Sequence, residues 1–434
     1  IRRAYSLQPI DRGAFEKDLM KIDERVNIMS MIFSGRIMKI IPVAGDPNNK
    51  WISSQAEDGE ISSAQPLADK FFSSYVSALQ DGISTNNFNQ ADLIIEELKA
   101  YQKTEGVGVI PSSTRIKGEI LLNKLNVFSR LSMFYALLGM AFLVYLFLSV
   151  FKSHKNFSKP YKILFWLFLL GFAFHTIGLG LRWYVSGRAP WSNGYESMIY
   201  IAWTTTLAGL YFARKSFGGM AATLILSATL LLVAGLSFLD PEITPLVPVL
   251  KSYWLTIHVS LEAGSYGFLM LGALIALINL ILMIFLTDHN KDKVSRIVKE
   301  MSYISEITLI GGLAMVSIGT YLGGVWANES WGRYWGWDAK ETWALVTILV
   351  YAFILHMRLI PKINGLFAFN IATLFGWASV IMTYYGVNYY LSGLHSYAAG
   401  DPVPIPQWVY ISVASVITIS LLAYYKKRKF PIIS

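Results

Sequence analysis

Nine long apolar stretches set the strongest limit on what this chain can fold into. An α-helix needs about 20 apolar residues to cross a bilayer. Stretches near that length lie at 131–151, 161–182, 197–213, 219–238, 253–286, 303–325, 343–358, 365–390 and 407–425. Charged residues make up only 15% of the chain, against about 25% in typical soluble proteins. The pattern predicts an all-α polytopic membrane protein with about nine transmembrane helices.

The N-terminal part of the chain has a different composition. Residues 1–130 hold 16 Lys or Arg and 16 Asp or Glu, whereas residues 131–434 hold 21 and 12. Apolar residues in the first part recur at helical spacing, at 15–33, 66–79 and 90–103. We therefore expect a mostly helical extracytoplasmic domain at 1–130, a linking transmembrane helix and cytoplasmic loop at 131–160, and a membrane domain at 161–434.

Lysine and arginine are unevenly distributed between alternate loops. One set of loops holds 16 of them and the opposite set holds five. Cytoplasmic loops carry the excess of Lys and Arg in membrane proteins. The basic loops and the C-terminus are therefore expected in the cytoplasm, and residues 1–130 on the periplasmic side of a bacterial inner membrane. The net charge of +9 is explained in this way without a nucleic-acid partner.

The start of the sequence bears on this topology. The chain begins at Ile1, without an initiator Met or a signal peptide. An external N-terminal domain needs an upstream segment that carries it across the membrane. We therefore expect the chain to be part of a longer polypeptide with further membrane helices before residue 1.

Tryptophan is concentrated in the segment 326–343, on the expected outer side. Five Trp occur there, interleaved with glycines and with the charged residues Arg333, Asp338, Lys340 and Glu341. One interpretation is an interfacial aromatic belt. The other is a platform for a large planar ligand such as haem, because in a helix Trp331 and Trp335 would lie one turn apart and form one apolar face. The basic side chains would then meet peripheral carboxylates of the ligand.

Two of the six histidines are expected at the level of this segment. His258 lies one to two turns inside the outer end of 253–286, and His395 follows 365–390 in an outer loop. Two imidazoles on opposite faces of one haem would give bis-histidine ligation of the iron. The alternative for each is a polar contact between helices.

The other four histidines lie elsewhere. His356 is near the cytoplasmic end of 343–358, and its depth has no second imidazole in this chain, so a haem there would need a ligand from outside it. His175 is interpreted as a structural hydrogen-bonding residue. His154 and His289 fall in basic loops and are interpreted as surface residues.

Several motifs together resemble one family. Residues 331–338, Trp-Gly-Arg-Tyr-Trp-Gly-Trp-Asp, are similar to the WWD signature of haem-handling membrane proteins. Further matching stretches are 175–176, 182–183, 193–197, 254–260, 355–358 and 393–397. They resemble the CcsA half of System II cytochrome c biogenesis proteins over roughly 161–425, and the preceding part resembles the end of the CcsB half. The chain is thus similar to the C-terminal portion of a fused CcsBA protein.

The resemblance implies export of haem b across the membrane and its covalent attachment to apocytochrome c. Thioether bonds would join the haem to the two thiols of a CXXCH motif, as in a holocytochrome c synthase (cytochrome c haem lyase). The chain has no Cys, so it cannot keep those thiols reduced by exchange, and a separate thiol reductant outside the membrane is implied. The missing CcsB-like half would be a further partner.

The resemblance also assigns site residues. His258 and His395 would be the outer axial ligands of the iron, and His356 one transmembrane ligand. Asp338 is expected to orient a ligand or the acceptor peptide. The expected contacts of the haem ring and its propionates are Trp326, Trp331, Trp335, Trp337, Arg333, Lys340, Arg182 and Arg188.

Two rival functions remain open. The first is a haem chaperone or transporter that presents haem without catalysing its attachment. The second is a structural membrane subunit that binds no haem and whose Trp residues form only an interfacial belt.

Overall fold

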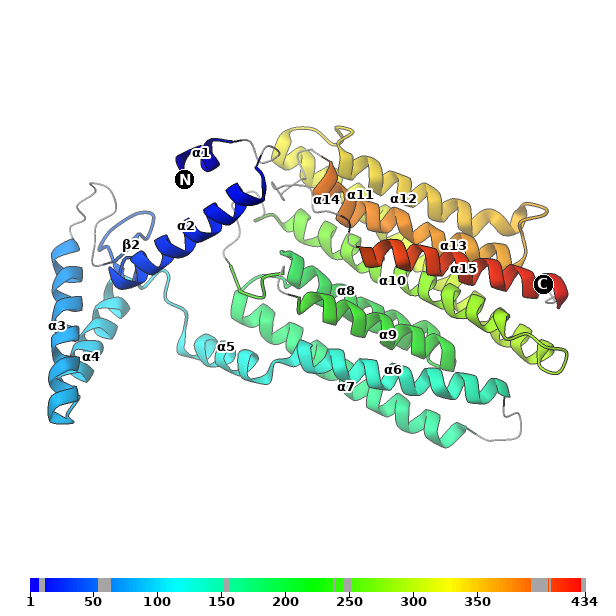
Figure 1. Cartoon of the computed structure of the whole chain (residues 1–434), viewed down its shortest axis with the longest axis horizontal. Helices are drawn as coiled ribbons and strands as arrows, with labels where there is room; N and C mark the ends of the chain where they lie inside the picture. The colour runs from blue at the N-terminus through cyan, green and yellow to red at the C-terminus, as the bar shows by residue number, and fades with distance from the viewer. Residues whose placement is uncertain are drawn as a thin grey trace. The chain divides into compact units, whose positions relative to one another are not determined.

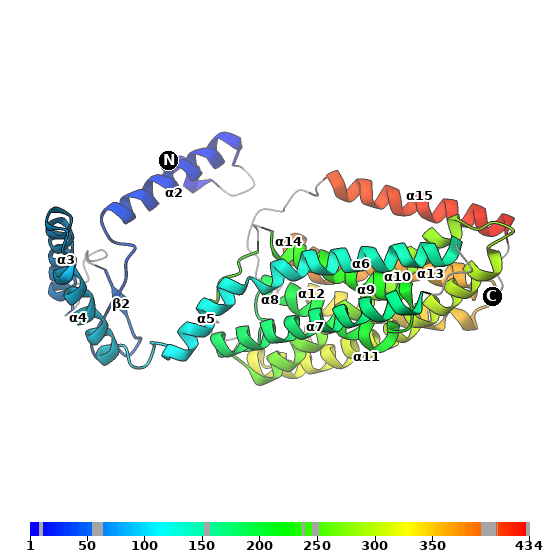
Figure 2. The same cartoon turned by 90° about the horizontal axis from the view of Figure 1, so that it is seen from below.

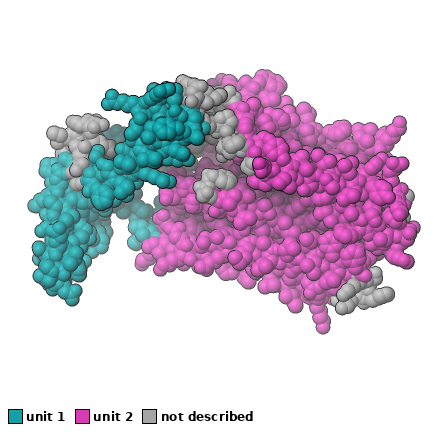
Figure 3. Space-filling model, viewed as in Figure 1, with its two compact units in different colours: residues 1–116 teal, residues 117–434 magenta. Residues whose placement is uncertain are grey.

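The computed structural model describes residues 1–7, 12–53, 64–151, 157–236, 239–244, 251–391, 405 and 407–430. The chain divides into two compact units, Ile1–Ile116 and Lys117–Ser434, which Figure 3 shows in different colours.

The first unit is helical apart from one short hairpin. Its helices are α1 (Arg2–Ser6), α2 (Ala14–Phe33), α3 (Gln65–Thr85) and α4 (Asn89–Glu105). The last three confirm the helices expected at 15–33, 66–79 and 90–103. Strands β1 (Ile41–Pro42) and β2 (Trp51–Ile52) pair antiparallel, and α4 holds them because Tyr101 Oη donates to Pro42 O at 3.1 Å.

The membrane unit contains the long apolar helices that the sequence predicts. Among the described residues, eight helices are long and apolar enough to cross a membrane. They are α5 with α6 (Ser113–Leu125 and Val127–Phe151), α7 (Ser158–Ser186), α9 (Phe217–Ala234), α10 (Tyr253–Ile284), α11 (Lys291–Trp331), α12 with η4 (Ala339–His356 and Met357–Leu359), α13 with η5 (Leu366–Ile381 and Met382–Gly386) and α15 (Gln407–Lys429). The all-α polytopic class is therefore confirmed.

The ninth expected stretch, 197–213, is helical but differs from the rest. It forms α8 (Gly194–Ala208), which has 15 residues, and continues as the π-helical turn η2 (Gly209–Ala213). At the junction α8 closely approaches α9, because a Cβ on Gly209 would lie 2.2 Å from Thr223. The short α14 (Val387–Tyr390) similarly extends α13 and η5.

Helix α10 is central to the membrane unit. It packs against α8, α9, α11, α13 and α15, and Figures 1 and 2 both show α8, α9, α11 and α13 running alongside it. Small residues permit the close contacts, as is usual between membrane helices: a Cβ on Gly267 would lie 2.5 Å from Thr204 Oγ1. Asn279 of α10 donates to Asn370 of α13 at 2.8 Å, which adds a buried polar contact in the interior.

Helix α11 is longer than the stretch expected at 303–325. It has 41 residues, because helical structure continues through the charged residues before that stretch and through the first Trp residues after it. Val294, Val298 and Met301 are buried at helical spacing in its first turns. Apolar run length alone therefore underestimates the helix.

Candidate functional site

A cavity of about 490 Å³ lies at one end of the membrane unit. This volume is in the range of small-molecule sites, about 300–1,000 Å³. Its walls come from the first turns of α10, the last turns of α11, the segment that follows α11, the start of α12, η5 with α14, and the start of α8 with the loop before it. The polar and aromatic residues of most interest in its lining are Arg188, His258, Glu262, Trp326, Trp335 and Lys340.

His258 is held in a defined orientation on the cavity wall. Its Nδ1 lies 2.7 Å from Gly319 O of α11. A carbonyl only accepts, so Nδ1 carries the proton and the lone pair of the neutral ring is on Nε2. A backbone carbonyl fixes metal-ligating histidines in the same way. Gly323 makes room for the ring, since a Cβ there would lie 2.6 Å from His258 Cε1.

Glu262 is a cavity residue that the sequence patterns did not single out. It lies four residues after His258 on α10, with 9% of its surface exposed. Its Oε1 accepts a hydrogen bond from Thr320 Oγ1 at 2.8 Å. The signal that could have found it is its spacing: four residues from His258 places both on one face of the helix. An ionisable residue inside a membrane helix is also a functional candidate by default.

The Trp segment is not one helical face. Helix α11 ends at Trp331, and Gly332 follows in a left-handed conformation, with φ of 71°. Trp331 packs edge-on against Trp326, at 4.8 Å between ring centroids, and Trp335 packs edge-on against Trp337, at 5.7 Å. The expected flat face of Trp331 and Trp335 is therefore wrong, because the left-handed glycine breaks the helix between them. Of the four rings, Trp326 and Trp335 line the cavity.

Glu341 organises the loop between α11 and α12. Its Oε2 accepts from Gly336 N at 2.7 Å and from Asp338 N at 3.3 Å, and its Oε1 lies 3.5 Å from Arg333 Nη1. The Arg333 guanidinium also lies over the Trp331 ring, 5.9 Å from its centroid. A side chain on Gly336 would collide with Arg333, so glycine at this position permits the arrangement.

Asp338 is the N-cap of α12. Its Oδ1 accepts from Glu341 N at 2.9 Å, and the two residues form a capping box. This contact explains part of the WWD motif by local structure. The expectation that Asp338 also orients a ligand or peptide stays a prediction.

Removing this cap is expected to destabilise the start of α12. Asp338→Ala should lower the free energy of unfolding by about 1 kcal/mol, because the backbone N–H of Glu341 loses its side-chain acceptor. Thermal unfolding in detergent measures the change. Asp338→Asn keeps a capping oxygen and should be close to wild type in stability. Equal stability of the Ala and Asn variants would contradict the capping role, whereas loss of function in a stable Asn variant would indicate a role for the carboxylate itself.

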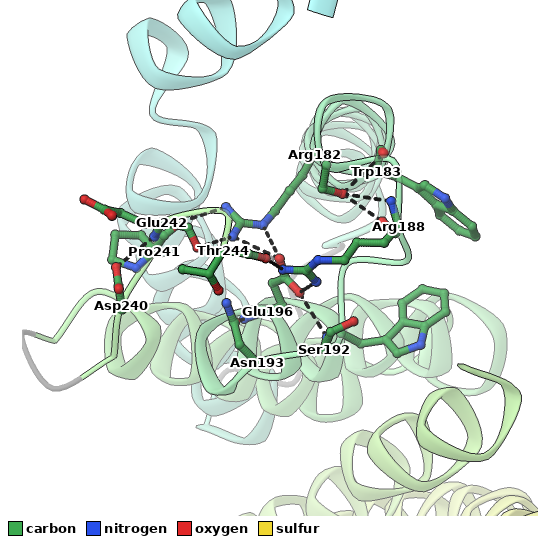
Figure 4. A network of polar contacts seen from close by, with 12 residues as sticks. Arg182, Trp183, Arg188, Ser192, Asn193, Glu196, Asp240, Pro241, Glu242 and Thr244 are labelled. Carbon is green, nitrogen blue, oxygen red and sulfur yellow. Dashed lines mark hydrogen bonds and ion pairs between the residues drawn. The ribbon is translucent and has the colours of Figure 1, made fainter. Parts of the chain in front are cut away.

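Arg182 and Arg188 converge on one buried carboxylate, that of Glu196 (Figure 4). Arg182 Nε donates to Glu196 Oε1 at 3.0 Å and Arg188 Nη1 to Glu196 Oε2 at 2.6 Å. The two guanidinium groups also donate to carbonyls of Pro241, Glu242 and Thr244. The network thus ties α7, α8 and the chain before α10 together, and Arg188 also reaches the cavity.

The remaining predicted site residues have varied positions. Lys340 lines the cavity, and its Nζ donates to Asn388 Oδ1 at 3.0 Å. His356 is exposed at the end of α12, with Nδ1 2.7 Å from Ala352 O. His395 and His154 lie outside the described residues. His175 is fully buried with Nε2 3.1 Å from Ile199 O, which confirms the structural hydrogen bond expected for it, and His289 is exposed.

These features define a class of protein: a multi-pass membrane protein with a ligand-sized, histidine-, tryptophan- and arginine-lined cavity at one end of its helices. The family model described as "Cytochrome C assembly protein" matches residues 191–395, which include most of the cavity. The chain is 35% identical over 245 residues to the cytochrome c biogenesis protein CcsA of Guillardia theta, of which it covers 81%. It belongs to the cytochrome c assembly protein family.

Two further relatives extend this comparison. The chain is 33% identical over 287 residues to CcsA of Trieres chinensis, and this match covers 58% of this chain and 90% of that protein. It is 42% identical over 428 residues to Protein NrfI of Wolinella succinogenes, covering 98% of this chain. The chain spans 47% of the length of that NrfI.

Proposed function

We propose that this protein exports haem b and attaches it covalently to the CXXCH motif of apocytochrome c, as a holocytochrome c synthase. Membership of the cytochrome c assembly family supports the process. The observation that carries the proposal is the orientation of His258, whose Nδ1 is bound to Gly319 O on the wall of a cavity of about 490 Å³. That arrangement suits an axial ligand of haem iron.

The other predicted residues receive roles in this proposal. His395 is the second outer ligand, and His356 is one ligand of a transmembrane site completed by a CcsB-like half. Trp326 and Trp335 contact the haem from the cavity wall, and Trp331 and Trp337 support them by edge-on packing.

Charged residues around the cavity complete the proposed site. Lys340 and Arg188 supply positive charge in the lining for the propionates. Arg333, which is bound to Glu341 in the loop between α11 and α12, is a third candidate for contact with a propionate. Arg182 is 4% exposed and occupied by Glu196 and by carbonyls, so we assign it to holding Arg188 and the loop rather than to direct propionate contact.

The proposed reaction depends more on positioning the thiol and the vinyl group than on activating either group. A thiol of the acceptor adds across a vinyl group of haem, and holding both in a productive geometry can supply about 7–11 kcal/mol of a barrier. The site would sit on the outer side of the membrane, as the Lys and Arg distribution predicts. A thiol reductant on that side would keep the acceptor cysteines reduced, because this chain contains no Cys.

Reconstitution tests the proposal against its rivals. The full-length natural protein, purified from haem-replete cells, is mixed with a CXXCH peptide and a thiol reductant, and the peptide is examined for covalent haem by mass spectrometry. A synthase gives a haem–peptide thioether. A haem chaperone or transporter shows a Soret band but yields no product, and a structural subunit shows no Soret band. Mesohaem, which lacks vinyl groups, serves as the control that binds without attaching.

A further inference from the structure

We propose that Glu262 carries a proton during thioether formation: it accepts the proton of the acceptor thiol and returns it to the vinyl group. The inference rests on the proposed function, since it concerns a step of that reaction. Its starting point is the position of the carboxyl group. Glu262 lines the same cavity as His258 and follows it by four residues on α10, so the two residues lie on one face of the helix, about 6 Å apart along its axis.

One residue of α11 positions both side chains. The carbonyl of Gly319 binds His258 Nδ1 at 2.7 Å. The missing side chain of Gly319 leaves room for Glu262, since a Cβ there would lie 3.0 Å from Glu262 Oε1. Thr320, the next residue, donates to that same oxygen at 2.8 Å. The histidine and the carboxyl group are therefore fixed relative to each other by the same turn of α11.

The surroundings of Glu262 differ from those of the other poorly exposed glutamates of the membrane unit. Glu196, Glu341 and Glu306 each have an arginine within 4.0 Å. In the described part of the chain Glu262 has no ion pair; its hydrogen-bond donors are the hydroxyls of Thr320 and Tyr266, at 2.8 and 3.5 Å.

This difference bears on what the carboxyl group does. A buried carboxyl group without an ion pair is costly to fold, and in membrane helices such groups mark functional sites. A hydroxyl can donate to a carboxylate or accept from a carboxylic acid, so Thr320 and Tyr266 can bind Glu262 in either protonation state, which a proton carrier requires.

The proposed step balances without an added oxidant or reductant. The S–H bond breaks, and its proton passes to the Glu262 carboxylate. The sulfur electron pair forms the C–S bond at the inner vinyl carbon. The π electrons of the vinyl group take the proton back from Glu262 to form a C–H bond at the outer vinyl carbon, which regenerates the carboxylate. General acid–base catalysis of this kind contributes about 10²–10⁴-fold to a rate.

Single-turnover attachment tests the inference. Haem-loaded full-length protein is mixed with the CXXCH peptide and reductant, and product is followed with time for wild type, Glu262→Gln, Glu262→Asp and Glu306→Gln. Glu262→Gln should keep the Soret band and the peptide concentration for half-saturation, while the limiting rate falls by about 10²–10⁴-fold. Glu262→Asp should recover part of that rate. Glu306→Gln makes the same chemical change at a glutamate that pairs with Arg358 and should match wild type.

Several outcomes would overturn the inference. Attachment by Glu262→Gln at the wild-type rate excludes a proton carrier at this position. Loss of the Soret band in that variant shows that Glu262 binds haem instead. If Glu262→Gln does not accumulate, Thr320→Val decides, because it removes the hydroxyl on Oε1 and keeps the carboxyl group: slower attachment with an unchanged Soret band supports the carrier, and an unchanged rate overturns it. Failure of wild type to attach haem would overturn the proposed function itself, and this step with it.

Discussion

Replacing His258 by Ala is expected to weaken haem binding at the outer site by more than about 100-fold. The reason is geometric: Nδ1 is hydrogen-bonded to Gly319 O at 2.7 Å, so in our proposal Nε2 is the nitrogen that binds the iron. Changes to groups that merely orient a metal ligand cost about 10–100-fold in affinity, and loss of the ligand itself should cost more. Haem content per protein and the Soret band of the purified full-length protein measure the effect, and cytochrome attachment should fall with it.

Two further variants separate ligation from general damage. His289→Ala makes the same change at an exposed histidine in a loop between α10 and α11 and should keep wild-type haem content. Gly323→Ala leaves His258 in place but pushes a methyl group against its ring, at 2.6 Å from Cε1, and should also lower haem content. Added imidazole should restore a Soret band to His258→Ala. Unchanged haem content in both His258→Ala and Gly323→Ala would refute the assignment of His258 as a ligand.

Replacing Glu196 by Gln is expected to destabilise the membrane unit by about 3–5 kcal/mol. Glu196 is fully buried and binds both Arg182 and Arg188. Removing one partner of a buried ion pair leaves uncompensated charge, and such changes cost about 3–5 kcal/mol. Arg182 would bear most of the effect, because only 4% of its surface is exposed. Thermal or denaturant unfolding in detergent should show the loss.

Glu242→Gln is the matched control for this change. Glu242 is exposed and contributes its backbone carbonyl, not its carboxylate, to the same network. Surface changes of this kind are usually within about 0.5 kcal/mol. Equal stability of the Glu196 and Glu242 variants would show that the ion pairs of Figure 4 contribute nothing to the fold.

The sequence could predict much of the fold but less of the site. Long apolar runs predict membrane helices because the bilayer sets their length, and that expectation was confirmed for α6, α7, α10 and others. The predicted apolar face of Trp331 and Trp335 was wrong, because a single left-handed residue, Gly332, ends the helix after Trp331. Helical spacing cannot reveal such a break, since glycine also occurs inside membrane helices.

The partner of each charged residue could not be read from the sequence either. Arg182 and Arg188 were expected as ligand contacts, and both turn out to bind Glu196 from a neighbouring helix. Glu262 was not predicted as a site residue, because no neighbouring residue in the sequence indicates its hydrogen-bond partner. Thr320, which donates to it, lies 58 positions away.

The amino-acid sequence alone was enough to define a multi-pass helical membrane protein, a Trp-rich segment, the histidine of α10 and the family resemblance. These follow from local composition and spacing, because a bilayer requires spanning segments to be helical and the helix period decides which residues share a face. Only the tertiary structure decided how the site is built. Gly319 brings His258 and Glu262 to one wall of the cavity, and Glu196 takes up the two arginines. Those contacts depend on which helices pack together, and that packing is between segments far apart in the sequence.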